Sequence, residues 1–515
     1  MADFDVVVVG GGSAGCVVAG RLCQTTNLKV CLVEAGPDYG PASSGRWPTE
    51  LLDPRQQPAT HDWGYTEERS DGSIIAESSA KVIGGCSTHN QCAAIWGVPD
   101  DYDRWAAAGN PGWSYAELAP LIDQIEQASP DQATSYRGRH GAVPTKPYGD
   151  GDLSTWQRSF LQSAVSAGFP RVIDLSAPEP AQGVAPFHVN VRGATRWNAA
   201  FAFLDPVRGR PNLTILEATV VDRLLIDQEE ATELICRSGT GIIELRAKMF
   251  VLAAGTYGSP AILMRSGIGP AAHLDELGIP VQIDAPGVGQ NLHDHPGVHV
   301  RFSPTPDVRR AVQEELAHAR LFQSQVILKA ASSQCAAGFD LHLLPYQEVT
   351  EAGEWEFVTL AFNMVPRSRG EVLLRGEDAE LPPRIAFQFL TDPDDRDIAI
   401  LLDGLHLARR LAETGPLASA VEWEVDPGQR IRSEADLRTY IRGTVTSYAH
   451  PVGTCKMGPL SDPMAVVDAS GRVQGTSNVF VADASIMPQI PRANTNLTCL
   501  LIGMRMADVL RRLAE

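Results

Sequence analysis

The first 34 residues contain the pattern that most restricts the possible fold. A β-branched run, Asp5–Val9, is followed at once by Gly10–Gly15, which fits the motif G-x-G-x-x-G. A helical stretch and a second apolar run come next, and the second run ends in Glu34. This order of strand, glycines, helix, strand and acid is typical of a dinucleotide-binding βαβ unit, whose buried parallel strands are continuous apolar runs. The sequence therefore predicts a Rossmann-type nucleotide domain rather than an isolated turn.

The residues of this glycine-rich stretch have distinct expected roles. Gly10 permits the tight turn, Gly12 lets a pyrophosphate approach the backbone, and Gly15 allows close packing of the helix on the strand. Ser13 and Ala14 lie between the glycines and are expected to contact the cofactor. A helical stretch, Cys16–Gln24, follows, and the N-terminus of this helix is expected to face the phosphates.

Glu34 ends the second strand, where its carboxylate can accept hydrogen bonds from a ribose. An acid at this position argues against NADP, because the ribose of NADP carries a phosphate there. It leaves both NAD and FAD open.

Composition and charge exclude several classes of partner. The chain has 515 residues, and 62 acidic against 43 basic residues give a formal net charge of −19. This charge argues against nucleic acid or an anionic membrane surface as a partner, and no apolar run is long enough to span a bilayer.

The nine cysteines are odd in number and lack zinc-site spacing, so we expect free thiols and no metal. With no secretory signal at the start, these features favour a cytoplasmic protein.

A second glycine-rich stretch, 80–97, contains a Gly-Gly pair followed by small and hydroxyl-bearing residues. The amides of such a loop can point at a phosphate or a flavin ring. The alternative is a plain turn, but His89 and Asn90 followed by apolar residues are unusual in a solvated loop.

The segment 449–497 has three polar residues among short apolar runs, namely His450, Asp483 and Asn494. A proline follows His450, and the residue before a proline is disfavoured in a helix. We therefore expect His450 at a strand end or turn, where its side chain can point into a pocket. By itself, a single histidine is more often a hydrogen-bonded structural residue than a catalyst.

Five segments, in one order along the chain, resemble the successive signatures of the glucose–methanol–choline (GMC) family of FAD oxidoreductases, in particular its choline oxidase-like subgroup. They are the opening fingerprint, the Lys81–Asn90 loop, Gly255–Gly269, Pro286–His295 and the C-terminal segment. The resemblance implies FAD as the cofactor and an α/β fold. In that fold a discontinuous Rossmann-type FAD-binding domain carries an α+β substrate-binding domain built on an antiparallel sheet. The implied FAD-binding domain comprises 1–155, 212–300 and 443–515, and the substrate-binding domain 156–211 and 301–442.

Local patterns agree with this division. Three apolar runs are expected strands of the nucleotide half, at 212–216, 220–225 and 248–252. Ala336–Tyr346 and Phe357–Val365 are expected strands of the substrate half, and Ile398–Glu413 has helical periodicity. The charged, alanine-rich stretch Pro304–Gln323 is expected to form a mobile segment or lid.

The resemblance also assigns the chemistry. Oxidising an alcohol removes a hydroxyl proton and a hydride, and because the flavin takes the hydride, the protein must supply a proton acceptor. The match to the family motif makes His450 that base and Asn494, which does not titrate, the residue that holds the substrate oxygen. Val221 would contact the adenine through its backbone, and Asp483 the ribityl or pyrophosphate region. The remaining cofactor contacts that the resemblance implies are Val82, Gly85, Cys86, His89, Asn90, Ala484 and Thr495.

His89 carries a more specific prediction. In the choline oxidase-like subgroup a histidine in a very similar run is joined covalently to the flavin. The resemblance therefore implies a covalent FAD linked through His89. The alternative is a noncovalent polar contact.

The predicted substrate pocket contains Trp47, Gly297 and Tyr448. Trp47 matches one aromatic residue that the subgroup uses around a quaternary ammonium, but Gly297 stands where the subgroup has a glutamate. A quaternary ammonium needs aromatic faces or a carboxylate. We therefore expect a small neutral primary alcohol, aromatic or aliphatic, in place of choline.

The expected reaction is oxidation of that alcohol to the aldehyde, with O2 as the acceptor and hydrogen peroxide as the second product. One alternative is a dehydrogenase of the same architecture that passes electrons to a quinone or another carrier. A further alternative is a flavin-containing lyase. The sequence leaves the oligomeric state open, a homodimer included.

Overall fold

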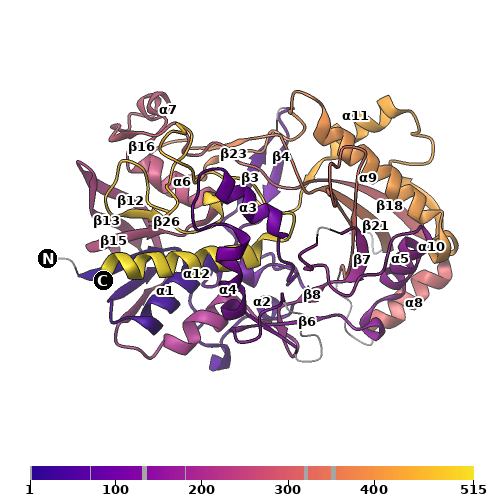
Figure 1. Ribbon diagram of the computed structural model, residues 1–515, viewed down its shortest axis with the longest axis horizontal. Helices are drawn as coiled ribbons and strands as arrows, with labels where there is room; N and C mark the ends of the chain where they lie inside the picture. Colours follow the sequence, from indigo (N-terminus) through magenta and orange to yellow (C-terminus); the bar gives the residue numbers. More distant parts are fainter. Residues whose placement is uncertain (1–2, 70, 130–135, 180, 318–322, 350–354) are drawn as a thin grey trace.

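The computed structural model describes residues 3–69, 71–129, 136–179, 181–317, 323–349 and 355–515. Two halves follow one another along the long axis of the molecule (Figure 1). One half contains a parallel sheet and both chain termini, and the other contains a large antiparallel sheet. Each half has its own core of buried apolar side chains.

The nucleotide half is built on a five-stranded parallel sheet. Its strands, in spatial order, are β11 (Leu213–Leu216), β2 (Val30–Val33), β1 (Phe4–Val9), β15 (Ala247–Leu252) and β26 (Val479–Val481). Every neighbouring pair is parallel. The inner strands are buried almost throughout, which explains why they are continuous apolar runs in the sequence.

Helices α1 (Ser13–Thr25) and α12 (Thr495–Ala514) pack closely against each other in this half (Figure 1). A Cβ atom added at Gly503 of α12 would lie 2.7 Å from the carbonyl oxygen of Ala14 in α1. A Cβ added at Gly15 would lie only 1.9 Å from the carbonyl oxygen of Gly10. Gly15 therefore has the close-packing role that the fingerprint predicts, because no larger residue fits between the helix and the preceding turn.

Smaller elements surround this sheet. An antiparallel three-stranded sheet consists of β12 (Thr219–Asp227), β13 (Glu230–Ser238) and β14 (Gly241–Leu245). A four-stranded sheet consists of β22 (Glu371–Leu373), β23 (Arg384–Ala386), β3 (Tyr65–Glu68) and β4 (Ile74–Glu77). The helices of this region are α2 (Thr49–Leu52), α3 (Pro99–Ala107), α4 (Tyr115–Ile125), α6 (Gly255–Arg265) and α7 (Ala271–Glu276).

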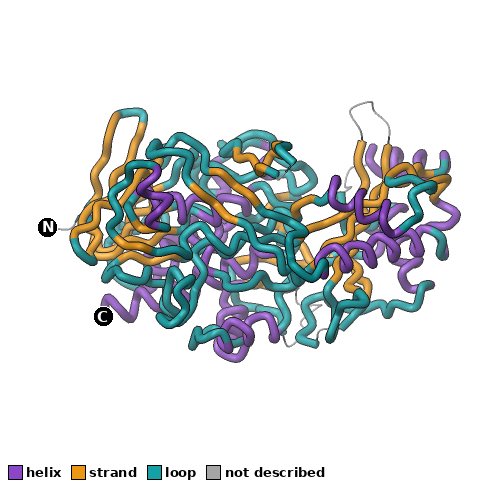
Figure 2. The backbone as a smooth tube through the Cα atoms, turned by 90° about the horizontal axis from the view of Figure 1, so that it is seen from above, coloured by secondary structure: helices purple, strands orange, loops and turns teal. Residues whose placement is uncertain are grey.

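A seven-stranded antiparallel sheet forms the other half. Its main path is β24 (Val421–Asp426), β18 (Pro296–Pro304), β21 (Trp355–Asn363), β20 (Leu341–Val349), β19 (Val326–Ala330) and β7 (Gly183–Pro186), and β25 (Thr446–Ser447) also pairs with β18. Its helices lie at the end of the molecule away from the termini (Figure 2). They are α5 (Thr155–Ser166), α8 (Pro306–Ala317), α9 (Arg396–Ala412), α10 (Gly415–Ala420) and α11 (Glu434–Thr444).

The predicted α/β fold, with a Rossmann-type half and an antiparallel-sheet half, is confirmed. The predicted strands at 212–216, 220–225, 248–252 and 357–365 are β11, β12, β15 and β21, and the predicted helix at 398–413 is α9. The domain boundaries stay a prediction. Strand β18 begins at Pro296, so the large sheet includes residues 296–300, which the predicted division assigns to the nucleotide half.

One local prediction differs from the structure, and another stays a prediction. Strand β20 begins at Leu341 and not at Ala336, because the chain turns through Gly338, whose φ of 75° lies in the left-handed region. The suspected lid at 304–323 contains helix α8, which the Glu315 carboxylate ties to the backbone N–H of Thr155 at 3.0 Å. Residues 318–322 of that stretch lie outside the described part of the chain.

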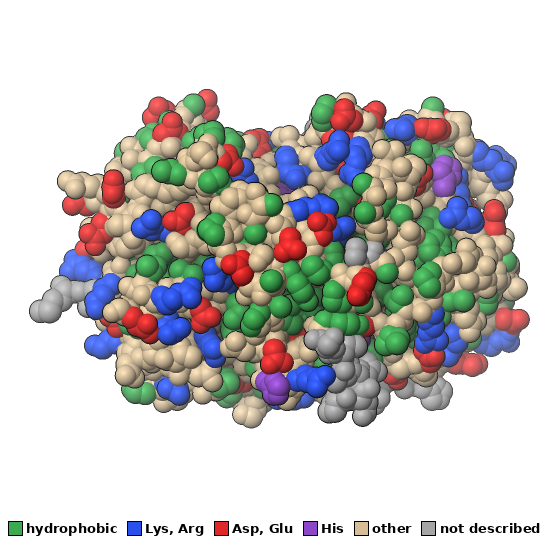
Figure 3. All heavy atoms as spheres, viewed as in Figure 1, with side chains coloured by type: hydrophobic (Ala, Val, Ile, Leu, Met, Phe, Trp, Pro, Cys, Tyr) green, Lys and Arg blue, Asp and Glu red, His purple; other side chains and the backbone are tan. Residues whose placement is uncertain are grey.

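Acidic and basic side chains alternate over the face drawn in Figure 3. Among the described helices, none is long and apolar enough to cross a membrane.

Candidate functional site

A cavity of about 550 Å³ opens at the carboxyl ends of the parallel strands. That edge is where open α/β sheets bind nucleotides. Eleven of the predicted cofactor residues line the cavity: Gly10, Gly12, Ser13, Ala14, Glu34, Gly85, Cys86, Val221, Asp483, Ala484 and Thr495. Gly15, Val82, His89 and Asn90 are not among its lining residues.

The two glycine-rich stretches meet at the cavity wall. A Cβ added at Gly85 would lie 2.6 Å from the Cα of Gly12, so the two backbones approach as closely as glycine allows. The N-cap of α1, Gly12, has no side chain to cap the first N–H groups of the helix. These groups remain available to an anion, which fits a pyrophosphate at this point.

The Glu34 side chain is 6% exposed and is oriented by two backbone amides. Its Oε2 accepts a hydrogen bond from the Gly11 N–H at 2.8 Å, and its Oε1 accepts one from the Gly36 N–H at 2.7 Å. Burial raises the pKa of this carboxyl group. Each carboxylate oxygen has a second lone pair, so Glu34 can still accept from a ribose hydroxyl.

Asp483 connects the end of β26 to the start of α6. Its Oδ2 accepts hydrogen bonds from the Gly255 N–H at 2.9 Å and the Ser259 hydroxyl at 2.6 Å. Its Oδ1 accepts from the Ser485 N–H at 2.8 Å. This predicted cofactor residue therefore fixes the two chain segments that line the middle of the cavity.

His89 and Asn90, on the loop after Gly85, differ in their hydrogen bonding. The Asn90 Oδ1 accepts a hydrogen bond from the Cys92 N–H at 3.1 Å, and the Asn90 carbonyl accepts one from Arg196. The two ring nitrogens of His89 are buried and have no hydrogen-bond partner in the described part of the chain. Burial lowers the pKa of His89 to about 4, so its imidazole is neutral at neutral pH.

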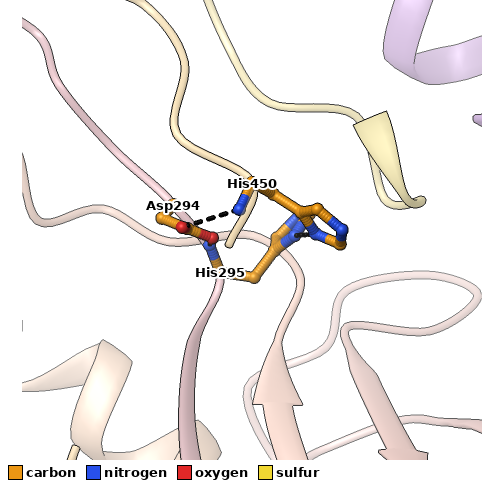
Figure 4. Close-up of side chains that lie close together, drawn as sticks. All are labelled: Asp294, His295 and His450. Carbon is orange, nitrogen blue, oxygen red and sulfur yellow. Dashed lines mark hydrogen bonds between the residues drawn. The ribbon is translucent and has the colours of Figure 1, made fainter. Parts of the chain in front are cut away.

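His450 lies between two partners beyond this cavity, whose walls include its neighbours Ala449 and Pro451. Its Nε2 is 3.2 Å from Asn494 Nδ2, and its Nδ1 is 3.2 Å from His295 Nδ1 (Figure 4). The backbone turns sharply just before it, because Ala449 has a φ of 61° in the left-handed region. The structure thus brings the predicted pair His450 and Asn494 together.

The hydrogen bonds determine which nitrogen of His450 carries the proton. The Pro491 carbonyl oxygen lies 3.1 Å from His295 Nε2, and a carbonyl can only accept, so His295 Nε2 carries the hydrogen. Neutral His295 then accepts at Nδ1, which requires His450 to donate from its own Nδ1. His450 Nε2 is therefore unprotonated and accepts from the Asn494 amide. Burial lowers the pKa of His450 to about 3, so the imidazole is neutral and its Nε2 carries no proton.

Asp294 holds the backbone of this cluster. Its Oδ2 accepts hydrogen bonds from the His450 N–H at 2.8 Å and the Ser447 hydroxyl at 2.7 Å, and its Oδ1 accepts from the His295 N–H at 2.5 Å. Ligand atoms of Asp294, His295 and His450 lie within 4.8 Å of one another, which is a distance that metal ligands can have. Because these atoms already bond to one another or to backbone N–H groups, the cluster has the properties of a positioning network.

The predicted substrate residues separate into two places. Tyr448 stacks on Phe362 with ring centroids 3.8 Å apart and lies 4.3 Å from the His450 ring. A Cβ added at Gly297 would lie 2.3 Å from the Phe362 ring, so Gly297 also belongs to this group. Trp47 instead packs on Phe201 and Tyr39 in the core of the nucleotide half, and its indole N–H donates to the Gly40 carbonyl.

Sequence reasoning missed Phe362 and the role of His295. His295 belongs to a segment quoted for the family resemblance, but only its hydrogen bonds reveal that it orients His450. Phe362 reaches the site because β21 pairs with β18, which places it opposite Gly297. The sequence contains no signal for that pairing.

Three buried histidines near this site make stability sensitive to acid. Burial lowers the pKa values of His293, His295 and His342 well below the ordinary value. In the unfolded chain each titrates near ~6.5, so below that pH the unfolded state binds more protons and the folded state loses stability. Together these three histidines are expected to lower the free energy of unfolding by about 4 kcal/mol between pH 7 and pH 5.5, and the share of each is measured as the change in the pH-dependent shift of the urea midpoint when that histidine is replaced.

A His342→Leu variant is the matched control, because it removes one of the three groups. It should remove about 1.3 kcal/mol of the acid-induced loss between pH 7 and pH 5.5, which is the share of one such histidine. An unchanged pH dependence in a folded His342→Leu variant would contradict the burial of a neutral His342.

Comparisons with known proteins agree with this arrangement. Residues 4–297 match the N-terminal family model of the GMC oxidoreductases and residues 366–503 the C-terminal one. Choline oxidase from Arthrobacter globiformis is 33% identical over 99% of this chain and 94% of its own. Oxygen-dependent choline dehydrogenase from Brucella anthropi is 32% identical over 98% of this chain and 95% of its own.

Solved structures give the same result. Pyridoxine 4-oxidase from Mesorbium loti has a TM-score of 0.88 and 31% identity, covering 98% of this chain and 99% of its own. A fungal aryl-alcohol oxidase has a TM-score of 0.85 at 22% identity over 100% of both chains, which shows the shared fold. The cofactor is therefore the FAD that the sequence predicts, and the chain belongs to the GMC oxidoreductase family.

Proposed function

We propose that the protein oxidises a small, neutral primary alcohol to the aldehyde by hydride transfer to FAD, with O2 as the electron acceptor and hydrogen peroxide as the product. The observation that supports this most directly is the unprotonated Nε2 of His450, 3.2 Å from the Asn494 amide beside the FAD cavity. A neutral imidazole next to a nontitrating donor suits an alcohol that must lose its hydroxyl proton.

In the proposed reaction the bound FAD supplies the hydride acceptor. The substrate oxygen is placed within hydrogen-bond reach of both His450 Nε2 and the Asn494 amide, which donates to it. His450 Nε2 takes the hydroxyl proton, while its Nδ1–H stays hydrogen-bonded to His295. Asp294 keeps the backbone of both histidines in place, so the base does not have to reorganise as it becomes charged.

A neutral substrate is favoured by the surroundings of His450. Gly297 provides no carboxylate there, and the nearest ring pair is Phe362 with Tyr448. Choline is the substrate in the names of the two sequence relatives, whereas pyridoxine and aryl alcohols are named in the structural ones. The aromatic pair agrees better with the second group, and the proposal includes aliphatic alcohols of similar size.

The test is anaerobic mixing of the FAD-loaded protein with a panel of primary alcohols, followed by admission of oxygen. Bleaching of the flavin by an alcohol, then recovery with stoichiometric peroxide, is the expected result. Bleaching without peroxide on aeration would identify a dehydrogenase that uses another carrier, as the second candidate. No bleaching by any alcohol, with cleavage of a cyanohydrin, would identify a lyase and refute the proposal.

We further propose that FAD is covalently linked through His89. The support is a neutral, half-buried imidazole on the loop that begins at the cavity wall with Gly85. Its two ring nitrogens are buried and have no hydrogen-bond partner in the described part of the chain. After acid precipitation the flavin should stay with the protein pellet, and a flavin-bearing peptide should contain His89. His89→Ala should release all FAD on precipitation, whereas the exposed-histidine variant His406→Ala should not. Release of FAD from the unmodified protein would contradict the linkage.

The proposed location is the cytoplasm. All nine cysteines are unpaired, which agrees with a reducing compartment.

A further inference from the structure

One row of directly paired residues crosses the large antiparallel sheet. Lys329 of β19 pairs with His342 of β20, His342 pairs with Phe362 of β21, and Phe362 pairs with Gly297 of β18. Directly paired side chains of an antiparallel sheet lie on the same face. The register therefore puts His342 in line with the two residues that already border the catalytic site.

Helix α9 covers the opposite face of this sheet. A Cβ added at Gly404 of α9 would lie 2.8 Å from the Cβ of Ala361, the residue before Phe362. The Asn363 amide, on the other side of Phe362, donates to Asp397 of α9 at 3.0 Å. Because side chains alternate along a strand, Phe362 and His342 face away from α9 and toward Tyr448 and the catalytic cluster.

The His342 side chain is fully buried, and neither ring nitrogen has a hydrogen-bond partner in the described part of the chain. Burial, with the nearby positive charge of Lys329, lowers its pKa well below the ordinary value. A neutral imidazole offers one donor and one acceptor. A buried side chain with both groups unused is rare, and a bound polar group would give it partners.

His342 lies at the distance expected for the far end of a bound substrate. Neighbouring strands are about 4.8 Å apart, so His342 on β20 is about 10 Å from Gly297 on β18, with Phe362 between them. A planar substrate whose hydroxyl meets His450 can extend along Phe362 and Tyr448 toward His342. The remote end of such a substrate then meets a donor and an acceptor.

We propose that His342 binds an uncharged polar group, such as a ring hydroxyl, carbonyl or heteroaromatic nitrogen, on the end of the substrate remote from the oxidised carbon. The substrate class is therefore an aromatic alcohol with a polar ring substituent. This inference rests on the proposed alcohol oxidation. A neutral His342 interacts with such a group as donor or acceptor, and the stacked pair of Phe362 and Tyr448 borders the substrate ring.

The test compares kcat/KM for benzyl alcohol with that for hydroxybenzyl alcohols and pyridylmethanols. The unmodified protein should prefer at least one of the polar-substituted alcohols by about tenfold or more. In His342→Leu this preference should fall to near unity, mainly through KM, while activity on benzyl alcohol stays within about threefold. His342→Gln, which keeps a donor and an acceptor, should retain part of the preference.

His273→Leu is the matched control, because it removes a partly buried histidine of α7 in the other half of the molecule. FAD content and the unfolding midpoint of each variant show whether it has folded. The inference about His342 is overturned if folded His342→Leu keeps the preference for polar-substituted alcohols. It is also overturned if the unmodified protein oxidises benzyl alcohol but shows no such preference. Neither result affects the proposed alcohol oxidation. If no alcohol bleaches the flavin, the proposed function fails and the inference with it.

Discussion

Replacing His450 by alanine is expected to slow flavin reduction by an alcohol by about 10²–10⁴-fold, because the hydroxyl proton then has no acceptor in the site. FAD should stay bound, since His450 itself is not among the residues that line the FAD cavity. Stopped-flow absorbance under anaerobic conditions, with a saturating alcohol, measures the rate directly.

The control for this variant is His406→Ala, which changes an exposed histidine on α9. It should reduce flavin at the rate of the unmodified protein. If His450→Ala keeps near-full activity, the base lies elsewhere, and the hydrogen-bond chain from Pro491 through His295 to His450 has only a structural role.

Gly15→Ala is expected to abolish FAD binding and to lower the free energy of unfolding by about 1–3 kcal/mol or more. The new methyl group would lie 1.9 Å from the carbonyl oxygen of Gly10, which is backbone and cannot rotate away. Either α1 moves off the sheet or the phosphate turn opens, and each change removes the helix N-terminus from the cofactor. The ratio of flavin to protein after purification and the thermal unfolding midpoint check both effects.

Gly443→Ala supplies a control with the same chemical change and the opposite expected sign. Gly443 is in helix α11, and a Cβ there meets nothing within 4 Å. Alanine favours a helix over glycine by about 1 kcal/mol, so this variant should be slightly more stable and keep its FAD. Full FAD binding by Gly15→Ala would show that the turn is less tightly packed than the structure indicates.

The nucleotide half was predictable because its signals are local. The strand, glycines, helix and acid between Asp5 and Glu34 follow one another in sequence, and each is required by the geometry of the same short unit. Helix α9 was predictable for a similar reason, since one apolar stripe at helical spacing reports its buried face.

The roof of the site is the sheet face that carries Gly297, Phe362 and His342. It was not predictable from the sequence, because it depends on which strands pair and in what register. Phe362 and His342 are separated from Gly297 by many residues and meet only through the pairs β18–β21 and β21–β20. A shift of one residue in either pair would turn their side chains toward α9. Trp47 illustrates the converse, because a match to a motif assigned it to the pocket while its contacts lie in the nucleotide core.

The catalytic and roof residues come from separate parts of the chain. His450 and Asn494 lie on the segments that follow β25 and precede α12, and they are held by Asp294 and each other. Phe362 and His342 lie within strands whose backbones are fixed by their own ladder. Substitutions in the roof can therefore change which alcohol is accepted and leave His450 and Asn494 in place. The same oxidation chemistry can then diversify in substrate through mutations on a single sheet face.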